Sequence, residues 1–182
     1  EEISELFPGY NLSPNISLNK TKIKNKIFLN KVNKFASNKK LVIVAPSANW
    51  IGKTWPIQNF CSLLKKLLKD KNFKNSYFII VGPDNEKRLI QDLLKLRNLP
   101  IFDLVGKTDL VEIFLIMKKS KLFIGNDSGL MHLSALANIP TVGLFGPSDS
   151  NRYHPWGKKT LAIKSPKSPD ELMGYKEFNP KK

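Results

Sequence analysis

Residues 122–145 read LFIGNDSGLMHLSALANIPTVGLF, and this stretch decides the fold. Its apolar runs at 122–125 and 141–145 have the length of strands, and the segment at 130–138, rich in small residues, predicts a short helix between them. Both runs are apolar throughout, as in a parallel sheet with helices on both faces. The stretch therefore predicts a strand–helix–strand unit of an α/β fold.

The same alternation continues on both sides of this unit. Apolar runs at 41–45, 77–82, 101–105 and 160–164 predict four more strands. Helices are predicted where apolar side chains recur at helical spacing: Phe60, Leu63, Leu64, Leu67 and Leu68; Leu89, Ile90, Leu93 and Leu94; and Leu110, Ile113, Phe114 and Met117, this last group following a cap at Thr108 or Asp109. We therefore predict a Rossmann-like parallel sheet covered by helices on both faces.

Composition divides the chain into three segments. Residues 1–39 hold scattered Pro, Asn and Lys before a weak helical pattern, and we interpret them as a linker that ends in a bridging helix. Residues 40–165 form the predicted compact domain, and residues 166–182, with three prolines, a surface crossing segment. The chain begins at Glu1 without an initiator methionine, which is consistent with a fragment of a longer protein.

Charge and cysteine content narrow the class of function. The net charge is +15, but the basic residues are 27 lysines and only three arginines. Because base readout and bidentate phosphate contacts favour arginine, specific nucleic-acid binding is disfavoured, and a peripheral attraction to anionic lipid fits better. A single cysteine, Cys61, forbids an internal disulfide and a cysteine-built metal site, and indicates a reducing compartment.

The loop after the strand at 122–125 carries the most informative chemistry. Ligands of parallel sheets bind where the strands end. Ser128 and Gly129 would place free backbone N–H groups at a helix N-terminus, ready for a phosphate, and His132, one turn further on, would add a hydrogen bond. The alternative is that Asp127 or Ser128 merely caps the helix and His132 packs against the sheet.

A second loop follows the strand at 41–45. Ser47 and Asn49 offer a hydroxyl and an amide, and Lys53, between two tryptophans, offers a cation that suits a phosphate. The alternative is that Lys53 is one of many solvated lysines. After the strand at 77–82, the carboxylate of Glu86 could accept hydrogen bonds from ribose hydroxyls, or simply complement a helix dipole in its first turn.

Several common motifs are missing. The sequence has no Gly-x-Gly-x-x-Gly, no P-loop, no Asp-x-Asp and no Gly-x-Ser-x-Gly. Ordinary dinucleotide oxidoreductases, P-loop NTPases and serine hydrolases therefore lose support, and no metal site is predicted. Any chemistry here would rely on protein donors to stabilise a leaving phosphate.

Taken together, the motifs resemble glycosyltransferase family 9, the ADP-heptose:lipopolysaccharide heptosyltransferases. The run at 126–133, followed by Pro140-Thr141-Val142 and the run at 144–148, resembles the family signature. Other elements lie in the family's order and spacing: Lys53-x-Trp55-Pro56, Val81-Gly82 with Glu86, Val105-Gly106-Lys107-Thr108, and Pro155-Trp156-Gly157. The similarity spans roughly residues 41–157.

The resemblance implies the C-terminal, donor-binding half of a GT-B enzyme. Lys53 would contact the donor's diphosphate, Glu86 the ribose, and Asp127 the sugar hydroxyls. The matching motifs also imply donor contacts for other residues: Ser47 and Asn49 after the first strand; Ser128, Gly129 and His132 around the phosphates; and Val105 and Gly106, in the loop at 104–110, beside the base. Lys53, Asp127 and His132 would be the catalytic residues of this half, whereas the general base would belong to an N-terminal half that residues 1–39 are too short to supply.

The implied reaction is an inverting, metal-independent transfer of heptose or a related sugar from an ADP-sugar to a lipopolysaccharide core acceptor, without a cofactor. The resemblance also implies a cytoplasmic enzyme at the inner membrane, where the lysine excess would help docking, and a fragment that is inactive alone. Two other functions remain open from the sequence: a non-catalytic basic module that binds RNA or anionic surfaces, and a GT-B-type nucleotide-sugar epimerase.

Overall fold

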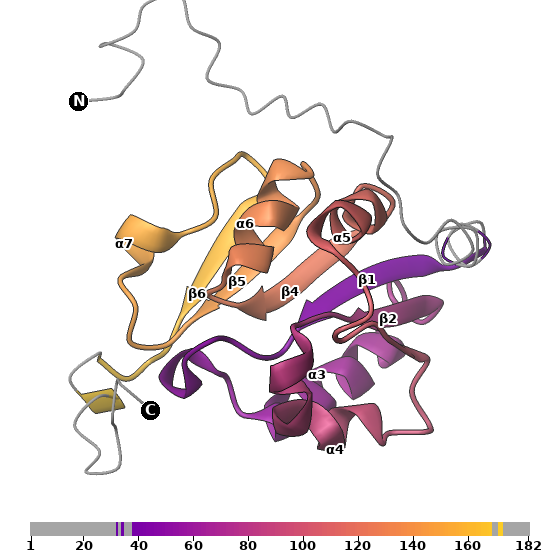
Figure 1. Cartoon of the computed structure of the whole chain (residues 1–182), viewed down its shortest axis with the longest axis horizontal. Coiled ribbons are helices and arrows are strands. Elements are labelled where there is room, and N and C mark those ends of the chain that lie inside the picture. The colour runs from indigo at the N-terminus through magenta and orange to yellow at the C-terminus, as the bar shows by residue number, and fades with distance from the viewer. Residues whose placement is uncertain (1–31, 33, 35–37, 169–170, 173–182) are drawn as a thin grey trace, which may run out of the picture.

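The computed structural model describes residues 32, 34, 38–168, 171 and 172 (Figure 1). The predicted linker at 1–39 lies almost entirely outside these residues, as does most of the predicted crossing segment at 166–182. Both interpretations therefore stay predictions. In the part of the chain that is described, no helix is long and apolar enough to cross a membrane.

The centre of the fold is a six-stranded sheet in which every pairing is parallel. Its order is β3-β2-β1-β4-β5-β6. The strands are β1 (Lys40–Ala45), β2 (Ser76–Ile80), β3 (Ile101–Asp103), β4 (Leu122–Asn126), β5 (Thr141–Phe145) and β6 (Thr160–Lys164). From β1 the strand order runs outward to β2 and β3 on one side and to β4, β5 and β6 on the other, so the order reverses between β1 and β4. At such a switch point the loops that follow the two strands diverge and leave a crevice for ligands.

Helices cover both faces of the sheet, as the apolar strands predict. Figure 1 shows α5 (Leu110–Met117) and α6 (Gly129–Leu136) on one face and α3 (Ile57–Lys69) and α4 (Gln91–Leu94) on the other. Alternate residues of β1 enter the two cores: Ile43 packs with α5 and α6, and Val44 packs with α3. The predicted fold class, an α/β fold built on a parallel sheet, is confirmed.

Two predicted elements differ from the structure. The helix expected around Leu89–Leu94 is a 3-10 helix, η3 (Asp84–Ile90), followed by the four-residue α4, because Ile90 leaves helical geometry at φ −115°, ψ 13°. Only Ile90 and Leu93 need burial there, while Leu89 is exposed. β3 is also shorter than expected, since the Asp103 carboxylate accepts the Val105 N–H at 3.0 Å and turns the chain.

The start of α5 resolves an open choice of cap. The side chain of Asp109, not Thr108, accepts the Glu112 N–H at 2.8 Å, and the Glu112 carboxylate accepts the Asp109 N–H at 3.2 Å. This reciprocal capping box satisfies two helix N-terminal donors. It also fixes where the connection from β3 enters the helix.

Candidate functional site

The loops after β1 and β4 meet through an ion pair at the switch point. Lys53, in the short 3-10 helix η2 (Ile51–Lys53), lies with its Nζ 2.7 Å from Oδ2 of Asp127, which directly follows β4. The Asp127 side chain is only 6% exposed and that of Lys53 25%. Lys53 is therefore not a freely solvated lysine, and two residues that the sequence singled out separately lie in direct contact.

The N-terminus of α6 adjoins this pair and is open. Ser128 occupies the N-cap position, but its side chain makes no capping hydrogen bond. A Cβ added to Gly129 would meet no atom within 4 Å, so the backbone there can be approached closely. His132 is exposed, and the alternative that it packs against the sheet is wrong. The terminus therefore presents free N–H groups to solvent.

Buried hydroxyl groups gather at the same edge of the sheet. Burial of a hydroxyl without a hydrogen-bond partner costs about 1–3 kcal/mol, so such groups are natural contacts for a polar ligand. Among the described residues, those with a partnerless hydroxyl at this edge are Ser47 and Thr54 after β1, Thr108 after β3, Ser128 after β4, and Ser148 and Ser150 after β5. Ser76, at the start of β2, is the same kind of group at the opposite edge.

The loop after β5 adds two residues that sequence reasoning missed. In the four-residue α7 (Ser150–Tyr153), the Tyr153 ring centroid lies 5.9 Å from Lys53 Nζ and 5.3 Å from the Arg152 guanidinium carbon. Both distances are within the range of cation–π attraction. Their position after β5 was the available signal, because ligands of parallel sheets bind where the strands end.

The loops after β2 and β3 form the other side of the site. Gly106 has φ +71°, and a Cβ there would lie 2.5 Å from the Cβ of Asp84. Its N–H donates to the Gly82 carbonyl at 2.9 Å, which ties the two loops together. Glu86 lies half-buried in the first turn of η3. It follows β2, which is separated from the strand of Asp127 by β1.

The predicted donor contacts Val105, Asn49 and Ser47 differ in the polar groups that they can offer a ligand. The Val105 side chain is fully buried in the core, and its N–H is already bonded to Asp103. Asn49 is exposed on the β1 loop, whereas Ser47 beside it is buried, with its Oγ facing the backbone of Gly82. The predicted residues thus line one edge of the sheet, and only Lys53 and Asp127 form an ion pair.

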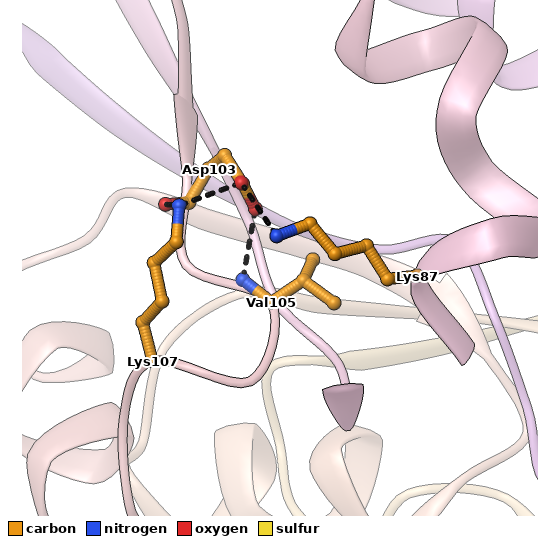
Figure 2. Close-up of polar contacts among 4 residues, drawn as sticks. All are labelled: Lys87, Asp103, Val105 and Lys107. Carbon is orange, nitrogen blue, oxygen red and sulfur yellow. Dashed lines mark hydrogen bonds and ion pairs between the residues drawn. The ribbon is translucent and has the colours of Figure 1, made fainter. Parts of the chain in front are cut away.

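Asp103 organises the loop that follows β3 (Figure 2). Its carboxylate accepts Lys107 Nζ at 2.7 Å and the Val105 N–H at 3.0 Å, and Lys87 Nζ lies 3.6 Å away. Partial burial alone would raise the pKa of Asp103, but the two hydrogen bonds and the charges of Lys107 and Lys87 outweigh it and hold the pKa below its usual value. The loop is therefore held in shape by an ionised carboxylate.

A cavity of about 550 Å³ lies beside the Lys53 loop, on the α3 face of the sheet. Lys53 and Thr54 contribute to its rim, and Val142, Leu144 and Ile163 to its apolar wall. Such a wall suits a hydrophobic group better than a diphosphate. Across the described ranges, no three His, Cys, Asp or Glu side chains cluster closely enough to hold a metal ion.

Comparison with known proteins relates this chain to one family. Residues 7–180 match glycosyltransferase family 9 (heptosyltransferase). The chain is 27% identical over 124 residues to lipopolysaccharide heptosyltransferase 3 of Escherichia coli, covering 66% of this chain and 35% of that protein. It is 30% identical over 133 residues to lipooligosaccharide heptosyltransferase 2 of Campylobacter jejuni, covering 70% of this chain and 40% of that protein.

Solved structures show the same fold. The ADP-heptose lipopolysaccharide heptosyltransferase II of E. coli matches with a TM-score of 0.71 and 22% identity, over 98% of this chain and 53% of that one. The E. coli heptosyltransferase WaaC with ADP-2-deoxy-2-fluoro heptose matches with a TM-score of 0.59 and 20% identity, over 78% and 42%. The chain thus spans about half or less of these relatives. On the match over residues 7–180, the chain belongs to glycosyltransferase family 9, the heptosyltransferase family.

Proposed function

We propose that this chain is the donor-binding part of a heptosyltransferase. In this proposal the enzyme transfers heptose, or a related sugar, from an ADP-sugar to a lipopolysaccharide core acceptor. The observation that carries the proposal is the Lys53–Asp127 ion pair at the switch point, beside the open N-terminus of α6. Membership of the glycosyltransferase family supports a transferase over a nucleotide-sugar epimerase.

Lys53 and the α6 N-terminus would act on the departing diphosphate. As the bond to the sugar loosens, negative charge grows on the leaving phosphate, and donors already in place stabilise that charge in the transition state. The diphosphate carries more charge than the Asp127 carboxylate, so Lys53 would exchange one partner for the other when the donor binds. Ser128, Gly129 and His132 would complete the phosphate contacts from the first turn of α6.

Asp127 would then be free to accept hydrogen bonds from the sugar hydroxyls. Glu86 would accept the ribose hydroxyls from the far side of the site, and the loop containing Val105 and Gly106 would flank the base. These assignments place the nucleotide over β1, β2 and β3 and the sugar near β4. Their support is positional, since all of these residues lie where strands end.

The acceptor site and the general base would correspond to the part of the relatives that this chain does not match. A base there would deprotonate the acceptor hydroxyl, which attacks the anomeric carbon opposite the leaving diphosphate and inverts it. The proposed reaction uses no metal and no cofactor. The proposal also places the enzyme in the cytoplasm against the inner membrane, where the lysine-rich surface would be attracted to anionic lipid.

The first test is nucleotide binding by the chain, measured by titration calorimetry with ADP, UDP, GDP and CMP at two salt concentrations. The proposal predicts preference for ADP. Lys53→Ala should weaken ADP binding about tenfold or more, since a charge-assisted hydrogen bond contributes roughly 1.5–3 kcal/mol. Lys66→Ala, which removes an exposed lysine from α3, is the matched control and should leave the affinity within twofold.

The net charge of +15 favours a second candidate, a basic module for RNA or anionic surfaces. Such a module should bind every anion in the panel, including a short RNA, and lose affinity steeply with salt. Equal losses for Lys53→Ala and Lys66→Ala would support the basic module and contradict the donor site. In the complete enzyme, wild-type turnover by Lys53→Ala would remove Lys53 from the proposed mechanism.

A further inference from the structure

We propose that Asn126 is a positioning residue, which clamps the loop that carries Lys53 and so holds the Lys53 ammonium where the donor's diphosphate binds. This inference rests on the proposed function, because it names the residue that positions the lysine of that site. The side-chain amide of Asn126 bonds the backbone of Trp55 and Pro46 and not the Lys53 ammonium. Its action would run through the backbone.

The Asn126 side chain bridges the two ends of the β1–α3 loop. Asn126 is the last residue of β4 and is fully buried. Its Oδ1 accepts the Trp55 N–H at 3.0 Å, and its Nδ2 donates to the Pro46 carbonyl at 2.8 Å. Pro46 begins the loop directly after β1, and Trp55 ends it just before α3. One amide therefore closes the whole segment that contains Lys53.

Between these two anchor points, the loop is held by local contacts. Within η2, the Lys53 N–H donates to the Trp50 carbonyl at 3.0 Å and the Thr54 N–H to the Ile51 carbonyl at 2.9 Å. These bonds shape the turn but do not attach it to the sheet. Asn126, which directly precedes Asp127 in the chain, attaches the loop to β4.

The other half of the ion pair is fixed independently. The Asp127 N–H donates to the Leu144 carbonyl of β5 at 3.0 Å, which continues the ladder one residue past β4. The backbone of Asp127 is thus set by the sheet, and the backbone of the Lys53 loop is set by Asn126. Two consecutive residues of one strand end therefore determine where both charges lie.

Only an amide matches both partners of the clamp. The Trp55 N–H needs an acceptor and the Pro46 carbonyl needs a donor, so aspartate would lose one bond and leucine, of similar size, would lose both. Without the clamp, the loop would have to be ordered when the ligand binds, and this ordering cost weakens affinity. Loss of Asn126 should therefore weaken binding chiefly by displacing Lys53, the only cation in the clamped loop.

A double-mutant cycle on ADP binding tests this route. Asn126→Leu should weaken ADP binding by about fivefold or more in the unaltered chain, as expected for loss of pre-organisation. In the Lys53→Ala background the same substitution should change the affinity by less than about twofold, since coupled residues are non-additive. The control is Ser134→Ala, because Ser134 is as buried and bonds Met131 and Thr141, away from the loop. It should lower the melting temperature and leave ADP affinity unchanged.

If Asn126→Leu does not fold, Asn126→Ser replaces it in the same cycle, since a hydroxyl is small enough for the site but too short to bridge both partners. Unchanged ADP affinity in a folded Asn126 variant would overturn the inference. So would an equal loss in the presence and absence of Lys53, which indicates general destabilisation. Failure of the unaltered chain to bind ADP would instead overturn the proposed function, and this inference with it.

Discussion

The contact between Lys53 and Asp127 brings two opposite charges together in a site that is proposed to bind a dianionic group. Asp127 is nearly buried, so its charge is stabilised by the lysine and poorly screened by water. A diphosphate that arrives at Lys53 must compete with this carboxylate and is repelled by it. Asp127 would therefore oppose the binding of a nucleotide alone. When sugar hydroxyls are present, the hydrogen bonds that they donate to Asp127 would offset this repulsion.

Asp127→Asn separates these two effects. Removal of the negative charge should tighten binding of ADP, which has no sugar to lose, by about threefold or more, because unit charges about 4 Å apart interact by roughly 1 kcal/mol even in water. Transfer from an ADP-sugar by the complete enzyme should instead fall. Calorimetric titration and a transfer assay measure the two quantities, with Asp92→Asn on the exposed side of α4 as the control. Weaker ADP binding by Asp127→Asn would show that Asp127 is a structural residue.

At the scale of elements, the site depends on how each strand ends. β3 stops at Asp103 because its carboxylate takes the Val105 N–H, and the chain then turns through Gly106 toward the capping box of α5. Lys107 and Lys87 neutralise the carboxylate from both sides (Figure 2). The loop expected beside the nucleotide base is therefore organised by an ionised side chain of the strand that precedes it.

This arrangement makes stability depend on pH. Since the pKa of Asp103 is lowered in the folded protein, its contribution is present above the unfolded value of about 3.9 and is lost as the pH falls through the folded value. Asp103→Asn should lower the melting temperature at neutral pH and flatten its fall below about pH 4. Asp92→Asn is again the control. Parallel melting curves for the two variants from pH 7 to 3 would contradict the assigned role of Asp103.

At the scale of the whole molecule, the order β3-β2-β1-β4-β5-β6 decides which loops meet. β1 and β4 are separated by 76 residues between Ala45 and Leu122 in the chain, yet they are paired in the sheet. The loops that follow them therefore form one site.

The whole molecule carries a net charge of +15, and the excess of positive charge destabilises the folded state through self-repulsion.

Moderate salt should therefore stabilise the unliganded chain. Raising sodium chloride from about 0.01 M to about 0.1 M shortens the screening length from roughly 30 Å to roughly 10 Å and weakens repulsion among the lysines. The melting temperature in a thermal-shift assay should rise, whereas a matched addition of a neutral sugar should reproduce little of the rise. A fall in the melting temperature with salt would show that attractive ion pairs outweigh the repulsion.

The sequence by itself determined the helices, the strands and the class of fold. This was possible because burying one face of a helix or a strand fixes the spacing of apolar residues within that short segment. The strands at 141–145 and 160–164 have the predicted bounds, and the residues that the sequence singled out after the strands lie along one edge of the sheet. Tertiary structure alone decided the partners: the Lys53–Asp127 pair, the approach of Tyr153 to Lys53, and the clamp of Asn126 on Pro46 and Trp55. These contacts join residues from separate loops, and their geometry depends on strand order and register, which no local pattern encodes.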